Sequence, residues 1–223
     1  THALIQDKVQ FKNLALTIID EQHRFGVSQR KTLYEKGNHP HNLSMTATPI
    51  PRTLALIIYG DMDISIIDEL PPGRQKIDTF VVDDSYMDRI DEFIIKQIKE
   101  GRQIFVVCPL IEENEMPLKS LEEIYIPYSS DKFLNRQVNT KYIHGKMKNE
   151  EKNSIMTDFL NNKIQILVST TVIEVGINVP NASTMVIYDA DRFGLSQLHQ
   201  LRGRVGRGSE KSYCILFNNN KSE

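Results

Sequence analysis

The sequence predicts an α/β protein with a mainly parallel sheet. Short apolar runs of strand length alternate with polar segments of helical character, which is typical of a parallel sheet with helices on both faces. Two of these runs, residues 103–110 and 164–171, are apolar over most of their length, as expected for strands buried inside such a sheet. The 223 residues allow one large domain or two modest ones.

The composition is ordinary for a globular protein, with 40% hydrophobic and 25% charged residues. The formal net charge of −2 excludes a global basic field, so any contact with nucleic acid depends on a local groove. Cys108 and Cys214 lie far apart inside apolar runs, which predicts buried, reduced thiols and argues against a zinc site. The sequence contains neither a membrane-length apolar run nor a signal peptide, so we expect a cytoplasmic protein without a membrane partner.

The clearest linker is the run at residues 70–74, where two prolines and a glycine separate apolar segments. It predicts a domain boundary, with a first part at residues 1–75 and a second part at residues 76–223. The chain starts at Thr1 rather than at a methionine, and we expect it to be a piece of a longer protein.

The first strand of the first part, residues 14–20, ends at Asp20, and Glu21 follows directly. Functional side chains are common at the carboxyl ends of parallel strands. Two adjacent carboxylates there suit a magnesium nucleotide, because one holds the metal and the other orients or deprotonates the attacking water. The alternative is a turn with two solvated acids.

The rest of the first part predicts a helix at residues 24–36, a strand from Asn42 and a second helix at residues 52–59. The strand ends in the hydroxyls of Thr46 and Thr48. These hydroxyls either relay hydrogen bonds from the acid pair to a partner domain or cap the following helix.

The second part supplies most of the sheet. Strands are predicted at residues 77–82, 103–110, 141–147, 164–171, 184–188 and 212–217. One helix is expected from Ser85, as its cap, to Glu100, and another opens at Asn149 and runs to Leu160. Residues 112–123 are acidic and irregular and are expected to be exposed, whereas residues 124–138 are assigned as helix.

A helix predicted from Gln197 runs into three arginines separated by glycines, Arg202, Arg204 and Arg207. The guanidinium group donates two parallel hydrogen bonds to a phosphate and stays charged, and glycines allow close backbone approach. Arg204 and Arg207 are therefore candidate arginine fingers for a nucleotide phosphate. The alternative is a solvated basic turn.

Five runs of the chain resemble the motifs of superfamily 2 helicases in order and spacing. Residues 18–27 resemble the Walker B motif, or motif II, and residues 44–53 resemble motif III. Residues 144–147, 170–180 and 200–207 resemble the second-domain motifs, which end with motif VI. Within the superfamily, the runs from Asp20 and from Asp68 look like those of the bacterial branched-DNA helicases, and the Mfd and PriA translocases are more distant alternatives.

The resemblance implies a RecA-like P-loop NTPase helicase fold, with a partial first domain carrying motifs II and III. A nearly complete second RecA-like domain would carry motifs IV to VI. It also implies an ATP-dependent DNA helicase or translocase that uses ATP and Mg²⁺. Its substrate would be branched double-stranded DNA, such as replication forks and recombination intermediates, in DNA repair and recombination.

The resemblance also implies the roles of individual residues. Asp20 would coordinate magnesium, Glu21 would activate water, and Arg204 and Arg207, with Gln200, would reach the phosphates across the cleft between the domains. The remaining roles are nucleotide-coupled signalling to DNA (Gln22, His23, Thr46, Thr48), a place in the cleft (Glu174, Gly176) and a position near the DNA backbone (His144, Gly145, Lys146, Thr170).

Two departures from the family pattern stand out. Asn178 occupies a position where relatives often carry aspartate, and no G-x-x-x-x-G-K-[ST] run occurs, so the loop that cradles phosphates is absent. The N-terminal DNA-binding wedge of the family is missing as well. We therefore expect this fragment to be inactive alone and to need the wedge and Walker A regions of the same protein.

Two hypotheses about the function of the chain remain open at this point. The chain is either part of a DNA helicase or a non-catalytic module that binds DNA or a partner; an RNA helicase is disfavoured by the run at residues 20–27. We also expect the incomplete sheet of residues 1–75 to leave unpaired edges and exposed apolar surface. We predict that this part packs on a neighbour, pairs with another copy or is poorly ordered.

Overall fold

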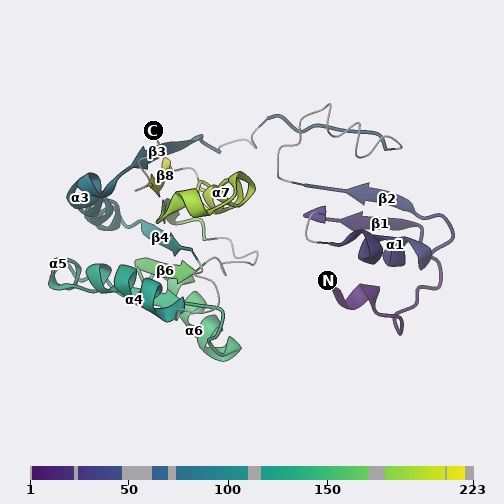
Figure 1. Ribbon diagram of the computed structural model, residues 1–223, viewed down its shortest axis with the longest axis horizontal. Coiled ribbons are helices and arrows are strands. Elements are labelled where there is room, and N and C mark those ends of the chain that lie inside the picture. The colour runs from purple at the N-terminus through teal and green to yellow at the C-terminus, as the bar shows by residue number, and fades with distance from the viewer. Residues whose placement is uncertain are drawn as a thin grey trace. The chain divides into compact units, whose positions relative to one another are not determined.

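A computed structural model of the chain describes residues 2–22, 25–46, 62–69, 74–109, 117–170, 179–208 and 210–218. The chain divides into two compact units, residues 1–66 and 67–223 (Figure 1). Residues 70–73 of the expected linker and the expected helix at residues 52–59 lie outside the described residues. The assignment of the two parts to helicase domains stays a prediction.

The first unit contains two parallel strands, β1 (Leu16–Ile19) and β2 (His41–Ser44). The connection between them includes helix α1 (Val27–Glu35), and the short 3-10 helix η1 (His2–Ile5) precedes β1. A β-α-β unit of this kind places the carboxyl ends of both strands at one edge of the sheet.

One face of this small sheet is apolar and exposed. Ile18 lies opposite Leu43 in the register of β1 and β2, so their side chains share a face. Ile18 is 56% exposed and Leu43 48% exposed, whereas Thr17 and Ile19 on the other face of β1 are buried. The exposed apolar surface expected for the first part is therefore present.

The second unit contains a six-stranded sheet in which every paired neighbour is parallel. The strands are β3 (Ile77–Val82), β4 (Gln103–Cys108), β5 (Thr140–Ile143), β6 (Ile166–Thr170), β7 (Ala182–Ile187) and β8 (Ser212–Phe217). Their spatial order is β3-β8-β7-β4-β6-β5. All six amino ends therefore lie along one edge of the sheet, and all six carboxyl ends lie along the other.

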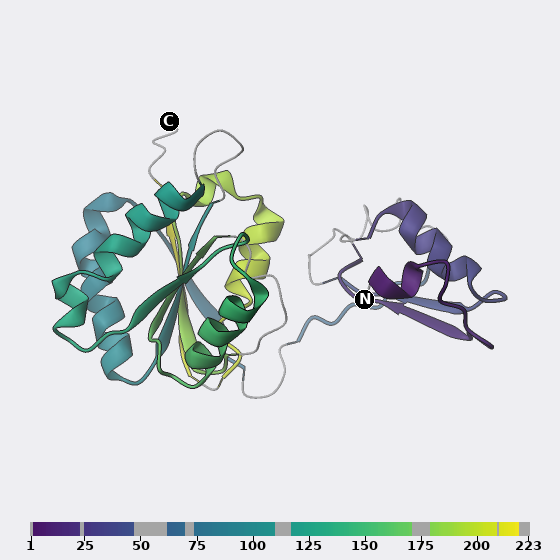
Figure 2. The same cartoon turned by 90° about the horizontal axis from the view of Figure 1, so that it is seen from below.

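Helices cover both faces of this sheet (Figure 2). The helices are α3 (Met87–Lys99), α4 (Pro117–Tyr128), α5 (Asp131–Leu134), α6 (Asn149–Leu160) and α7 (Leu195–Arg202), with short 3-10 helices η3 (Asp84–Tyr86) and η4 (Ala190–Arg192). Alternate residues of β4 serve the two faces: Phe105 packs with Phe159 of α6, whereas Val106 packs with Ile94 of α3. Successive side chains of a strand point to opposite faces of the sheet. Because helices cover both faces, the central strands are apolar throughout.

Two local expectations were wrong. Helix α3 has Tyr86 rather than Ser85 at its N-cap, and Asp83 caps the preceding η3, where its carboxylate accepts from the Ser85 backbone N–H at 2.9 Å. The predicted bounds of α6 are confirmed, since it begins at Asn149 and ends at Leu160, with Lys148 as its N-cap. The segment expected to be irregular becomes helical at Pro117, which is tolerated in a first turn where no N–H is needed.

The two cysteines are free and fully buried, as predicted. Burial raises the pKa of the Cys108 thiol to about 12 and that of the Cys214 thiol to about 11. Among the described residues, no helix has the length and apolarity needed to cross a membrane.

Candidate functional site

The acid pair lies at the carboxyl end of β1 in the first unit. Asp20 is exposed, and its Oδ1 accepts a hydrogen bond from the Glu21 backbone N–H at 2.9 Å. Glu21 adopts a left-handed backbone conformation with φ of 50°, which is uncommon for a residue with a side chain. Asp20 is thus the solvent-exposed acid of the pair, whereas Glu21 is half-buried.

Strand β2 brings the segment that contains Thr46 close to the acid pair. The Met45 N–H donates to the Ile19 carbonyl at 2.8 Å, and the Gln22 N–H donates to the Met45 carbonyl at 3.2 Å. Gln22 is buried and Thr46 exposed. The structure thus brings together the ends of motifs II and III, whereas His23 and Thr48 lie outside the described residues.

The arginine loop of the second unit begins where α7 ends. The Arg204 N–H donates to the Leu201 carbonyl at 3.0 Å, and the Val205 N–H donates to the Arg202 carbonyl at 3.3 Å. Val205 is fully buried, whereas Arg207 is exposed and its Nε donates to the Gly203 carbonyl at 3.4 Å. The backbone of the loop is therefore anchored in the core, with Arg207 on the surface.

Two glycines place this loop at the amino edge of the sheet. A Cβ on Gly206 would lie 2.9 Å from Cγ1 of Ile77, the first residue of β3, and a Cβ on Gly208 would lie 2.9 Å from the Pro180 carbonyl oxygen. Ser212, the first residue of β8, is also beside Gly206. Glycine is required in this loop because its backbone runs against neighbouring chain.

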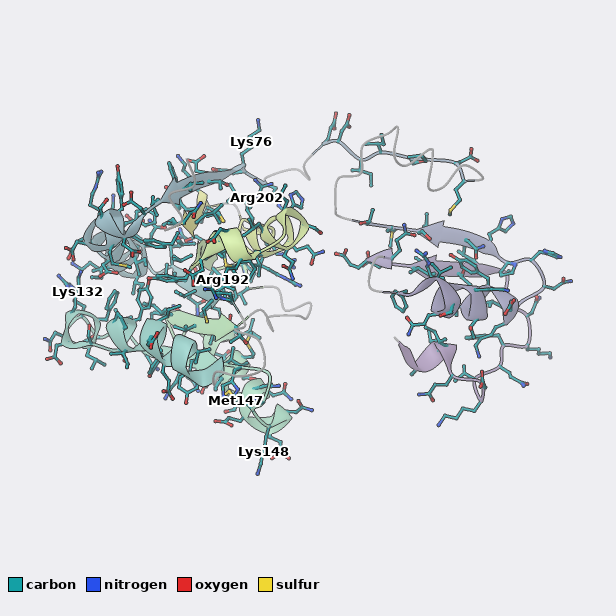
Figure 3. The ribbon with its side chains drawn as sticks, in the orientation of Figure 1. Lys76, Lys132, Met147, Lys148, Arg192 and Arg202 are labelled. Atoms are coloured by element: carbon teal, nitrogen blue, oxygen red, sulfur yellow. The ribbon has the colours of Figure 1, made fainter. Side chains whose placement is uncertain are left out.

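The last turn of α7 carries further polar groups. Arg202 is labelled on α7 in Figure 3. One of its guanidinium nitrogens lies 3.1 Å from Nδ1 of His199, and Gln200 is half-buried. The positive charge of Arg202 partly opposes the effect of burial on the pKa of Cys214. Basic groups near a helix C-terminus also interact favourably with the helix dipole.

The residues expected near DNA lie at the opposite, carboxyl edge of the same sheet. His144 follows the last residue of β5, and Thr170 is the last residue of β6. Gly145 and Lys146 are exposed, and the Lys152 ammonium donates to the Gly145 carbonyl at 2.6 Å. Thr170 is fully buried, and its hydroxyl has no hydrogen-bond partner among the described residues, so its side chain presents no surface to a ligand here.

His144 is the titratable group of this turn. Its ring stacks on Tyr142 with centroids 6.1 Å apart, and Tyr142 in turn meets Tyr125 edge to face at 5.0 Å. Desolvation lowers the pKa of His144, with Lys152 and Lys146 acting in the same direction against Glu151. His144 is therefore mainly neutral at pH 7, and the positive charge of the turn comes from its lysines.

Two predicted cleft residues, Glu174 and Gly176, lie outside the described residues, as does Asn178. Sequence reasoning gave Arg74 no role in the site and placed it at the end of the linker and of the family-like run that starts at Asp68. The Arg74 Nε donates to the Gly206 carbonyl at 3.1 Å, so it belongs to the arginine loop. No local pattern signals a contact between residues 132 positions apart.

Comparison with known families identifies the second unit. Residues 85–209, more than half of the chain, match the helicase conserved C-terminal domain. The chain belongs to this helicase family. The match covers most of the six-stranded sheet and the arginine loop, so this loop is part of a helicase C-terminal domain.

Relatives of this helicase chain are similar over its whole length. It is 57% identical to the ATP-dependent DNA helicase RecG of Bacillus subtilis strain 168 over 100% of the chain and 33% of that protein. RecG of Aquifex aeolicus strain VF5 is also 57% identical, over 97% of the chain and 27% of that protein. The chain thus spans about a third of the curated relatives it matches, and the predicted resemblance to a bacterial branched-DNA helicase is confirmed.

Solved structures confirm the RecA-like helicase fold. A structure of RecG bound to a three-way DNA junction has a TM-score of 0.74 and 47% sequence identity, over all of this chain and 28% of that one. Helicase Lhr of Mycobacterium smegmatis, bound to ssDNA and AMP-PNP, has a TM-score of 0.64 at 17% identity, over 93% of this chain and 29% of that one. The second likeness shows the fold alone.

Proposed function

We propose that this chain is part of the motor of an ATP-dependent DNA helicase that acts on branched DNA. The observation that carries the proposal is the 57% identity to RecG over the complete chain. The RecG structure at 47% identity is bound to a three-way DNA junction, which supports branched double-stranded DNA as the substrate class. We propose that such an enzyme acts in DNA repair and recombination. We also propose that the protein is located in the cytoplasm.

The first unit would supply the magnesium and water side of the ATP site. Asp20 is an exposed carboxylate at a strand end, which suits a magnesium ion held through its water shell. Bound Mg²⁺ neutralises the charge that develops on the phosphates. Glu21, turned aside by its left-handed backbone, would orient the attacking water and accept its proton.

The second unit would supply the charge that stabilises the transition state. Arg204 and Arg207 stand on a loop whose backbone is fixed by Val205 and Gly206, so little reorganisation would accompany the reaction. Gln200 would contact the phosphates beside them. Gln22 and Thr46 would couple the nucleotide state to DNA, and the basic turn that contains Lys146 would lie near the DNA backbone.

The test is ATP hydrolysis by the complete protein that contains this chain, measured with and without three-way-junction DNA. DNA should stimulate the wild-type protein, and Glu21→Gln should lower kcat by about 10³-fold or more because the isosteric amide cannot accept a proton. Binding of junction DNA should be unchanged in Glu21→Gln. A wild-type protein without DNA-stimulated hydrolysis would refute the proposal.

A non-catalytic role for the isolated 223 residues is a second candidate. It is favoured by the absence of a G-x-x-x-x-G-K-[ST] run from this sequence, because phosphates then lack their backbone cradle. The isolated chain should bind DNA weakly without hydrolysing ATP, and hydrolysis that is abolished by Glu21→Gln would exclude this role. Self-association of the isolated chain through the exposed face of β1 and β2 would make its measured molecular mass increase with protein concentration.

A further inference from the structure

The arginine loop is bound to the segment that leads out of the expected linker. Arg74 is the first described residue after residues 70–73, and its Nε donates to the Gly206 carbonyl at 3.1 Å. The bond is partly buried. Gly206 lies between Arg204 and Arg207, so the bonded carbonyl belongs to the short stretch of backbone that joins the two fingers.

A second contact fixes the same backbone from the side of β3. Gly206 has φ of +73°, a conformation that favours glycine, and a Cβ there would meet Cγ1 and Cδ1 of Ile77 at 2.9 and 3.1 Å. Ile77 is held by the pairing of β3 with β8, where it lies opposite Ser212. The segment from Arg74 to Ile77 therefore contacts the loop through one hydrogen bond and one close apolar packing contact.

We propose that Arg74 is a positioning residue for the Arg204 and Arg207 fingers, an inference that rests on the proposed ATP hydrolysis. A hydrogen bond from a charged donor is stronger and more directional than a neutral one. Here it ties the conformation of the loop to the last residue of the expected linker. A displacement of the chain at Arg74 would thus move the carbonyl of Gly206 and, with it, the fingers on either side.

The chemistry of the bond suggests a matched set of variants. Glutamine carries its Nε2 donor the same number of bonds from the backbone as the Nε of arginine, so Arg74→Gln retains an N–H donor without the charge. Methionine has a methyl group at that position, so Arg74→Met keeps the length and loses the donor. Lysine has a methylene there, so Arg74→Lys keeps the charge but shifts the donor by one atom.

The experiment measures kcat and KM for ATP in the complete protein with saturating three-way-junction DNA. Arg74→Met and Arg74→Lys should each lower kcat by about tenfold with KM changed less than threefold, because the fingers act chiefly in the transition state. Arg74→Gln should retain most of the wild-type kcat. A merely structural or charge role predicts a different order, in which Arg74→Lys is the best of the three.

Limited trypsin digestion gives a readout that does not depend on hydrolysis. Cleavage after Arg204 and Arg207, followed by mass spectrometry, should be several-fold faster in Arg74→Met than in the wild type and near wild-type in Arg74→Gln. Equal kcat and equal cleavage in Arg74→Met and wild type would overturn the inference. A wild-type protein without hydrolysis would instead overturn the proposed function, and the digestion would still decide the position of the loop.

Discussion

The two edges of the six-stranded sheet differ in how they hold their basic side chains. At the amino edge, the Arg204 and Arg207 loop is fixed by a buried valine, a glycine packed on Ile77 and the bond from Arg74. At the carboxyl edge, Lys146 stands exposed on a turn beside a half-buried His144. An anchored cationic site suits a single phosphoryl group whose charge must be met at one point, whereas an exposed lysine suits the regular backbone of DNA.

The largest expected effect tests the amino edge. Arg207→Ala and Arg204→Ala should each lower kcat for ATP by about 10³-fold or more, because an arginine finger stabilises charge that appears in the transition state. Junction-DNA affinity at fixed salt should change less than twofold. The comparison is measured by steady-state hydrolysis and fluorescence anisotropy in the complete protein.

Arg89→Ala is the matched control, since Arg89 is an exposed arginine on α3 that packs over Tyr86. It should retain wild-type kcat. If Arg207→Ala lost as much DNA affinity as hydrolytic activity, the amino edge could not be assigned to ATP alone and the proposed difference between the two edges would be wrong.

A smaller effect is expected at the carboxyl edge. Lys146→Ala should weaken DNA binding by about tenfold at low salt and reduce the slope of log affinity against log salt by about 1, because one phosphate contact is lost. Hydrolysis in the absence of DNA should stay unchanged. Lys163→Ala serves as the control, since Lys163 is exposed and pairs with Asp158. An unaltered salt slope in Lys146→Ala would remove this turn from the DNA-binding surface.

The smallest expected effect is on the pH dependence of stability and comes from the two buried cysteine thiols. Burial raises the pKa of Cys108 from 9.0 to about 12 and that of Cys214 from 9.0 to about 11. The folded protein keeps both thiols protonated at a pH where the unfolded chain releases their protons. The contribution of each thiol to stability is therefore full below pH 9 and falls as pH rises, from about 9 towards 11 for Cys214 and towards 12 for Cys108, by about 1 kcal/mol per thiol at pH 10.

Thermal unfolding between pH 8 and 10 measures this loss. Cys214→Ala should show a lower starting Tm but a shallower decline with pH, because one titrating group has been removed. A decline as steep as in the wild type would show that the Cys214 thiol does not contribute. Tyr128 and Tyr188 add to the decline only above pH 10, since burial raises the pKa of each above its ordinary value of 10.0.

Much of the second unit was predictable because its central strands, β4, β6 and β7, are buried on both faces. The bounds of β3 and β8 agree with the predicted strands residue for residue, and β4 begins where expected. The helix at Pro117 was missed because an acidic segment with few apolar residues carries little periodic signal. Its later residues, Leu121 and Tyr128, are fully buried, so tertiary packing decides its structure.

The site was predictable where its chemistry is local in sequence. The acid pair and the arginine loop are continuous runs, and their residue types alone point to phosphate chemistry. The contacts of Arg74, Ile77 and Pro180 with the loop were not predictable, because parallel pairing brings together residues far apart in the chain. The burial of Thr170 was likewise hidden, since only the complete sheet shields it.

Helix α7 has a consequence for how the two edges communicate. It starts after β7 has reached the carboxyl edge, and it ends where the arginine loop meets the amino edge. Its eight residues form about 12 Å of hydrogen-bonded helix between the carboxyl edge and the arginine loop. A single helix therefore lies on the direct covalent path between the two proposed sites, and a shift of this helix along its axis would alter both ends of that path.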